Sequence, residues 1–149
     1  TTPNTGDDVS LTGSLLNLGT LKINGTPNTG AMGVRVATNA ANGYSLSIKS
    51  ASSATGMVGS NGAEGFTIPA NAAVTTGTAG WAYKVGAGNQ TAITDKDVEI
   101  RAPGAITGTD TVDNKKAETT DVTFIVAADS NTHDGTYTGT VVFTATAQD

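Results

Sequence analysis

The feature that most constrains this chain is a two-residue alternation of apolar and polar side chains in short segments. The clearest runs are Tyr44–Ile48, Trp81–Val85, Val122–Val126 and Tyr137–Ala145. Successive side chains of a strand point to opposite faces, so each run predicts a strand with one buried face. No window shows the three- and four-residue apolar spacing of an amphipathic helix, and we expect no helix longer than a single turn.

Turn signals between the runs suggest how the strands connect. Weaker strand patterns occur at 9–15, 32–38, 57–58, 66–68 and 98–100. The pair Asn42-Gly43 predicts a hairpin between 32–38 and 44–48, and the turn-rich residues 129–135 predict antiparallel pairing of 122–126 with 137–145. The fold class is therefore expected to be all-β, an antiparallel Greek-key β-sandwich of about seven to eight strands.

Chain length and the leading residues suggest the domain organisation. The chain has 149 residues, which suits one domain with its own core. Residues 1–8 are polar and without period, and the alternation starts at residue 9. We expect residues 1–15 to be an N-terminal extension and residues 16–149 to be the sandwich.

Composition narrows the classes of function. Charged residues make up 14% of the chain and the net charge is −5, which disfavours nucleic acid and anionic membrane surfaces as partners. No apolar run reaches the roughly 20 residues of a membrane span, and the chain starts at Thr1, as a secreted chain does after its signal peptide is removed. We expect an extracellular, cell-surface location.

The sequence offers little for catalysis, and an enzyme is not expected. His133 is the only histidine and lies in a polar turn, and there is no cysteine. Neither a catalytic triad nor a zinc–thiolate site can be assembled from these residues in preference to chance. No cofactor is predicted.

Three weaker binding signals remain. Asp129, Asn131 and Asp134 fall within one loop and form a weak candidate Ca²⁺ site, although turn chemistry explains the same residues. Asn24 and Asn89 begin glycosylation acceptor triplets. The three aromatic residues of a potential sugar-stacking platform are more easily explained by core packing, which their alternation favours: Tyr44, Trp81 and Tyr83.

Four motifs in order give the chain a resemblance to a known family. They are Asn17-Leu-Gly-Thr20, Asn42-Gly-Tyr-Ser-Leu-Ser-Ile48, Trp81-Ala-Tyr83 and Asp134-Gly-Thr-Tyr-Thr-Gly-Thr-Val-Val-Phe-Thr-Ala145. Together they resemble the pilin-like immunoglobulin sandwiches of the chaperone-usher and spore coat U type. The chain differs from that family in lacking its early disulfide and in having a longer middle region.

The resemblance implies an incomplete immunoglobulin-like sandwich in which a neighbour's N-terminal segment fills an apolar groove as an added strand. Subunits of that type polymerise head to tail, so the partners are copies of the same chain. The implied donor segment is Val9, Leu11, Gly13 and Leu15, and the implied acceptor edge is Tyr137, Gly139, Val141, Phe143 and Ala145. Equally, residues 9–15 can fold onto their own domain as its first strand.

The expected function is that of a structural subunit of an extracellular filament or pilus. One alternative is a monomeric cell-surface module that binds a glycan or a host protein, consistent with the long loops. Another alternative is an S-layer or cell-wall repeat from a longer chain.

Overall fold

The computed structural model of the chain describes residues 9–11, 15–60 and 65–148. In this part there are eleven strands and no helix, so the predicted all-β sandwich is confirmed, with more strands than the expected seven or eight. The strands are β1 (Val9–Leu11), β2 (Asn28–Thr38), β3 (Tyr44–Ser50), β4 (Met57–Ser60), β5 (Thr67–Ile68), β6 (Gly80–Val85), β7 (Val98–Gly104), β8 (Thr111–Val112), β9 (Lys115–Ala127), β10 (Thr136–Thr138) and β11 (Val141–Ala147).

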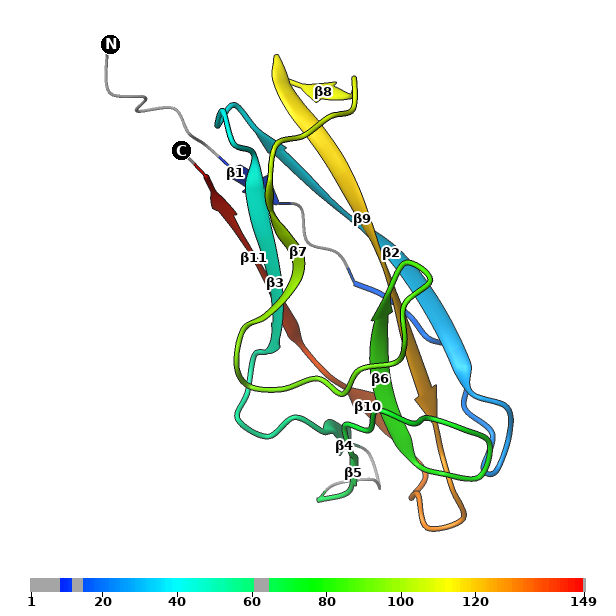
Figure 1. Cartoon of the computed structure of the whole chain (residues 1–149). Coiled ribbons are helices and arrows are strands. Elements are labelled where there is room, and N and C mark those ends of the chain that lie inside the picture. Colours follow the sequence, from blue (N-terminus) through cyan, green and yellow to red (C-terminus); the bar gives the residue numbers. More distant parts are fainter. Residues whose placement is uncertain (1–8, 12–14, 61–64, 149) are drawn as a thin grey trace.

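The strands form two facing sheets and a small third sheet at one end (Figure 1). The larger sheet has the order β1-β2-β9-β6, and β8 forms a hairpin with the start of β9. The opposite sheet has the order β11-β3-β7, and β10-β4-β5 make the small sheet at the lower end of Figure 1. Every strand pairing is antiparallel.

The core lies between the two larger sheets and is built from the alternating residues. In β3 the side chains alternate between buried and half-buried along the whole strand, as the sequence pattern predicts. Apolar residues of β2, β6 and β9 meet them from the opposite sheet. The buried members of this core on β2, β3, β6 and β9 are Val34, Val36, Tyr44, Leu46, Ile48, Trp81, Tyr83, Val122, Phe124 and Val126.

Both predicted pairings between strands adjacent in sequence are wrong. β2 pairs with β1 and β9, and β3 pairs with β11 and β7, so Asn42-Gly43 joins the two sheets and does not close a hairpin. Likewise, β9 pairs with β2 and β6, whereas β11 pairs with β3. In each case, the apolar faces of the two strands meet across the core because burial is greater face to face than edge to edge.

β9 is buried on both faces, which its sequence does not reveal. Phe124 and Val126 face the main core, while Ile125 and Ala127 pack with Val74 and Ala82 in a second cluster outside the sheet. The connection that carries Val74 lies over this outer face and is fixed by Gln90, whose side-chain amide bonds the backbone of Val74 at 2.7 and 3.2 Å. The sequence predicts one or two short strands in the long middle connection, and two are present there, β4 and β5.

Replacing Gly43 by alanine should lower the free energy of unfolding by about 2–5 kcal/mol, because two costs combine. Gly43 has a φ of +72°, and a Cβ there would lie 1.9 Å from the carbonyl oxygen of Gly104. Gly77 is a matched control, because its φ is +82° but a Cβ would meet nothing within 4 Å. Urea denaturation of Gly43→Ala and Gly77→Ala separates the cost of the positive φ from the cost of the clash. Equal losses of unfolding free energy would show that the close approach of the Gly104 carbonyl is unimportant.

Candidate functional site

The site that stands out is the outer edge of β11. β11 pairs with β3 on one side, and no other strand pairs with it within the described residues. Two other outer strands of the facing sheets, β6 and β7, are protected differently. The edge of β6 is covered by hydrogen bonds from Trp81 and Tyr83 to loop residues, and β7 carries Pro103 and a register irregularity, which discourage strand addition.

The register of β11 tells which of its backbone groups point to the free edge. Ala51 N–H donates to the Thr140 carbonyl at 3.0 Å, and Gln148 N–H donates to the Gly43 carbonyl at 2.9 Å. In an antiparallel pair, hydrogen-bonded residues alternate, so the even-numbered residues of β11 bond to β3. The N–H and C=O groups of Val141, Phe143 and Ala145 therefore point away from β3.

The same three residues carry the inward-facing side chains of β11. They are half-buried and pack against the core cluster, whereas the intervening Val142 is exposed. The inner side chains of β3 are fully buried by comparison. The core is thus thinner along β11 than along β3, at the residues whose backbone groups have no strand partner in the described part of the chain.

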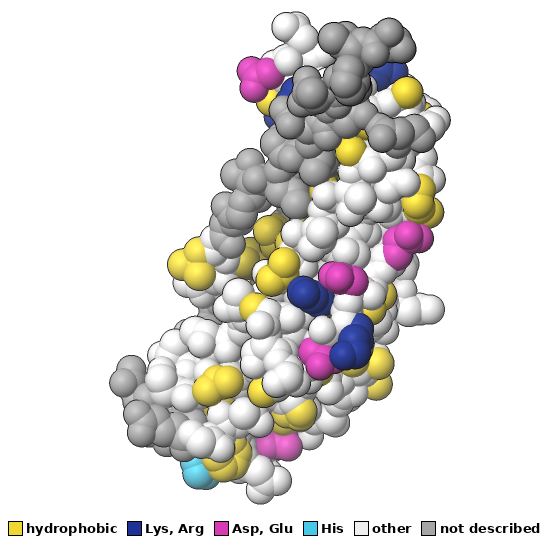
Figure 2. All heavy atoms as spheres, turned by 90° about the vertical axis from the view of Figure 1, so that its left-hand side faces the viewer, with side chains coloured by type: hydrophobic (Ala, Val, Ile, Leu, Met, Phe, Trp, Pro, Cys, Tyr) yellow, Lys and Arg dark blue, Asp and Glu magenta, His cyan; other side chains and the backbone are white. Residues whose placement is uncertain are grey.

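An apolar groove of about 1140 Å³ opens beside this edge. On one side it is bounded by residues 15–21 and Ile23, and on the other by residues 132–141 and Phe143, with core residues as its floor. Well-packed interiors leave few voids larger than a water molecule, so a groove of this size marks missing packing. Figure 2 views the side of the molecule on which β11 lies in Figure 1, and hydrophobic side chains are spread over this face with charged side chains among them. The floor residues are Met32, Val34, Met57, Trp81, Phe124 and Val126.

The structure brings together part of the predicted acceptor edge. Val141, Phe143 and Ala145 lie in β11. Tyr137 lies in β10 and pairs with Gly59 of β4, and its hydroxyl donates to the His133 carbonyl at 2.8 Å. Gly139 lies between β10 and β11, where a Cβ would be 3.5 Å from the indole of Trp81. Tyr137 and Gly139 thus form the lower wall of the groove, outside the β11 edge.

The predicted donor segment divides into parts with different positions. Val9 and Leu11 belong to β1, which pairs with Thr38 and Val36 at one end of β2 in the same chain. Gly13 lies outside the described residues, and Leu15 is 97% exposed. β1 also approaches β11 across the opening between the sheets, without pairing with it.

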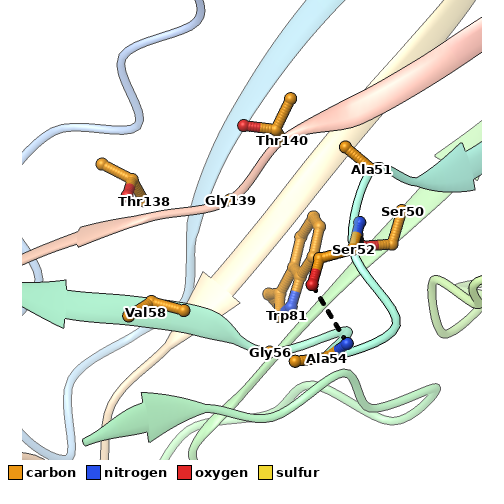
Figure 3. Close-up of a pocket in the computed structure, with 10 residues that line it drawn as sticks. All are labelled: Ser50, Ala51, Ser52, Ala54, Gly56, Val58, Trp81, Thr138, Gly139 and Thr140. Atoms are coloured by element: carbon orange, nitrogen blue, oxygen red, sulfur yellow. Dashed lines mark hydrogen bonds between the residues drawn. The ribbon is translucent and has the colours of Figure 1, made fainter. Parts of the chain in front are cut away.

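A smaller pocket of about 250 Å³ lies next to the groove (Figure 3). Trp81 lies between the 50–56 connection and residues 138–140, and its Nε1–H donates to the Thr55 carbonyl at 2.9 Å. Trp81, Tyr83 and Tyr44 are 4%, 2% and 0% exposed, respectively. The core-packing interpretation of these aromatic residues is confirmed, and they provide no exposed face on which a sugar ring could stack.

The candidate calcium loop is organised as a turn. One oxygen of the Asp129 carboxylate accepts hydrogen bonds from Asn131 N–H at 2.9 Å and from the Thr132 hydroxyl at 3.2 Å. No hydrogen bond or ion pair of the Asp134 carboxylate occurs among the described residues, and no group of three His, Asp or Glu side chains there could hold a metal ion. Asn24 and Asn89 are both exposed in loops.

Residues 9–11, 15–60 and 65–148 contain no side-chain arrangement typical of a catalytic centre. His133 is exposed and stacks on Phe66, with ring centres 3.6 Å apart. None of the described residues belongs to a helix long and apolar enough to cross a membrane. The expectation that the chain is not an enzyme stays a prediction.

A polar cluster that sequence reasoning missed joins the two sheets. The Arg101 guanidinium pairs with the Glu118 carboxylate and donates to the Tyr44 carbonyl, and it lies 4.0 Å from the centre of the Tyr44 ring. The Tyr44 hydroxyl donates to the same carboxylate at 2.9 Å. Burial and the hydrogen bond to Glu118 raise the pKa of Tyr44 to about 12. The alternating pattern predicts that Tyr44 is a core residue, but no pattern in the sequence predicts the contact between Arg101 and Glu118.

Comparison with known proteins adds no family: no protein-family model and no curated protein matches this chain. The functional argument therefore rests on the chain's own geometry.

Proposed function

We propose that this chain is a structural subunit of an extracellular filament or pilus that assembles when a strand from a neighbouring copy pairs with β11. The observation that carries the proposal is a coincidence at Val141 and Phe143, where backbone groups without a strand partner among the described residues occur together with half-buried apolar side chains beside the groove. An added strand would satisfy the backbone groups and fill the missing packing at once.

The proposed donor is the segment from residue 9 to residue 15. Its apolar side chains alternate as an added strand requires, and it contains no charged residue. In the single chain it is held to its own domain by the three-residue strand β1. Such a short strand contributes little pairing energy, so its release is a small cost compared with filling a neighbour's groove.

Exchange of the donor segment between copies would produce a filament because of where the two binding surfaces lie. The donor segment and the β11 edge are different surfaces of the subunit, so the contact between copies is heterologous and need not close into a ring. Assembly outside the cell agrees with the polar, weakly charged composition of the chain.

Deleting residues 1–15 should yield a folded subunit that no longer forms filaments, because the donor is lost and the acceptor edge is kept. Deleting residues 1–8 alone is the control and should leave assembly unchanged, because these residues carry no apolar alternation. Sedimentation velocity and electron microscopy distinguish the outcomes. Filaments of normal length from the chain without residues 1–15 would contradict the proposal.

A further inference from the structure

Residues 15–23, here called the leucine strap, run along one side of the groove opposite β11. The strap is apolar in sequence but forms no strand, apart from a single bridge between Ile23 and Ala128. Its two ends expose large apolar side chains, with Leu15 97% and Ile23 47% exposed. An apolar segment with exposed ends and little regular pairing is held weakly compared with the strands beneath it.

One side chain of β2 forms hydrogen bonds to the strap. The Asn28 side-chain amide donates to the carbonyls of Leu18 and Thr20, at 2.9 and 3.0 Å. Beyond this, the strap carries a local bond from Gly19 N–H to the Asn17 side chain at 2.9 Å. Next to the strap, Asn24 N–H donates to the Ala128 carbonyl at 3.0 Å.

The leucine side chains of the strap rest where β2 has no side chain. A Cβ on Gly30 would lie 2.5 Å from Leu18 Cδ2 and 3.4 Å from each Leu16 Cδ. Leu16 and Leu18 are half-buried and pack against the core cluster. Gly30 therefore acts as a notch in β2 that admits the two leucines to the edge of the core.

The same core surface would receive the side chains of an added strand. The groove floor includes Val34, Phe124 and Val126, and the strap lines the groove over this floor. A strand paired with β11 lies about 4.8 Å from it and directs alternate side chains into the core. Leu16 and Leu18 would then compete with the donor's apolar side chains for one apolar surface.

We infer that the leucine strap is an internal competitor for the groove, which covers it in the free subunit and moves away from Gly30 when a second copy adds its strand to β11. This inference rests on the proposed function and concerns the regulation of the same site. The apparent affinity for the incoming strand is then reduced by the fraction of subunits in which the strap is displaced. Free subunits would stay soluble until enough neighbours are present.

The variant Leu18→Cys/Gly30→Cys tests the inference directly. The chain has no cysteine, so the introduced pair supplies the only thiols. Loss of free thiol in a product that remains monomeric on a non-reducing gel confirms the bond within one chain. The full-length variant should form filaments at least about tenfold more slowly when oxidised than when reduced, because the strap cannot leave β2. Equal rates in the two states would overturn the inference.

A second variant tests the opposite direction. Leu16→Ser/Leu18→Ser weakens the strap's hold on the core and should speed assembly about tenfold, measured by light scattering. Val58→Ser is the matched control, because its side chain is 50% exposed and lies outside the strap, the donor segment and the groove. Slower assembly of the double variant would mean that the leucines support the acceptor groove and do not compete for it.

The two hypotheses fail in distinguishable ways. If the unaltered chain forms no filaments, and a synthetic peptide of residues 9–15 does not protect the Phe143 amide from hydrogen exchange, the proposed function fails. The other outcome is that filaments form and the peptide protects that amide, while oxidation of the cysteine pair changes neither the rate of filament formation nor the amide protection. In that case only the strap inference fails.

Discussion

Replacing Val141 by proline should abolish filament assembly and leave the subunit folded. The Val141 N–H points to the free edge of β11, so proline removes a donor that only an added strand would use. Proline is tolerated at sheet edges where the missing N–H faces outward, and its ring retains part of the apolar contact of the valine. Loss of this hydrogen bond and obstruction of the edge should weaken binding of a donor peptide about tenfold or more.

Val142→Pro is the matched control one residue away. Val142 lies opposite Lys49 in a hydrogen-bonded pair, so proline there breaks the β3–β11 ladder. Its unfolding free energy should fall by about 1–3 kcal/mol, because a backbone carbonyl in the sheet loses its partner. Thermal unfolding and electron microscopy of the two variants should therefore show opposite patterns. Normal filaments from Val141→Pro would rule out the β11 edge as the acceptor.

The sequence predicted which residues are buried far better than which strands pair. Alternation correctly placed Tyr44, Leu46 and Ile48 on the inner face of β3. The pairing errors arose because a turn signal such as Asn42-Gly43 is equally compatible with a hairpin and with a connection between sheets. Register and sheet membership depend on contacts between residues far apart in the chain, such as Val36 with Glu118, and local patterns do not encode these.

In the candidate site, too, the strand can be predicted from the sequence, whereas its neighbours in the sheet cannot. The strand that contains Val141, Phe143 and Ala145 was evident from its alternation, and its free edge is a property of the sheet order. The role of Gly30 could not be predicted, because a glycine in a strand signals a close approach without identifying the neighbour. Only the folded chain places Leu16 and Leu18 there.

The cluster around Arg101 connects the two facing sheets by polar contacts. Arg101 projects from β7, Glu118 from β9 and Tyr44 from β3, so the cluster joins both sheets at the end away from the small third sheet. The Arg101 side chain is 16% exposed and that of Glu118 is 35% exposed. The guanidinium also donates to the Ala102 and Gly104 carbonyls, at 3.0 and 3.1 Å, which satisfies its polar atoms.

Replacing Arg101 by methionine should lower the free energy of unfolding at neutral pH by about 2 kcal/mol. Breaking a fully buried ion pair costs about 3–5 kcal/mol, and the partial exposure of Glu118 reduces that figure. Arg35→Met is the matched control, because Arg35 pairs with Asp110 at 2.6 Å but both side chains are about half exposed. The control should change stability by no more than about 1 kcal/mol. Equal effects of the two substitutions would show that the cluster adds nothing beyond a surface pair.

The pH dependence of stability provides a separate test of the same cluster. Burial alone would raise the pKa of Glu118, but hydrogen bonds from Arg101 and Tyr44 outweigh it and hold that pKa below its ordinary value. A carboxylate with a lowered pKa in the folded state stabilises the fold above the unfolded pKa of about 4.3 and loses this contribution as the pH falls through the folded pKa. The stability advantage of the unaltered chain over Glu118→Gln, measured by urea denaturation, should therefore be constant at neutral pH and shrink as the pH falls below the unfolded pKa of about 4.3. A difference that stays constant through this acid range would mean that the Glu118 charge does not hold the two sheets together.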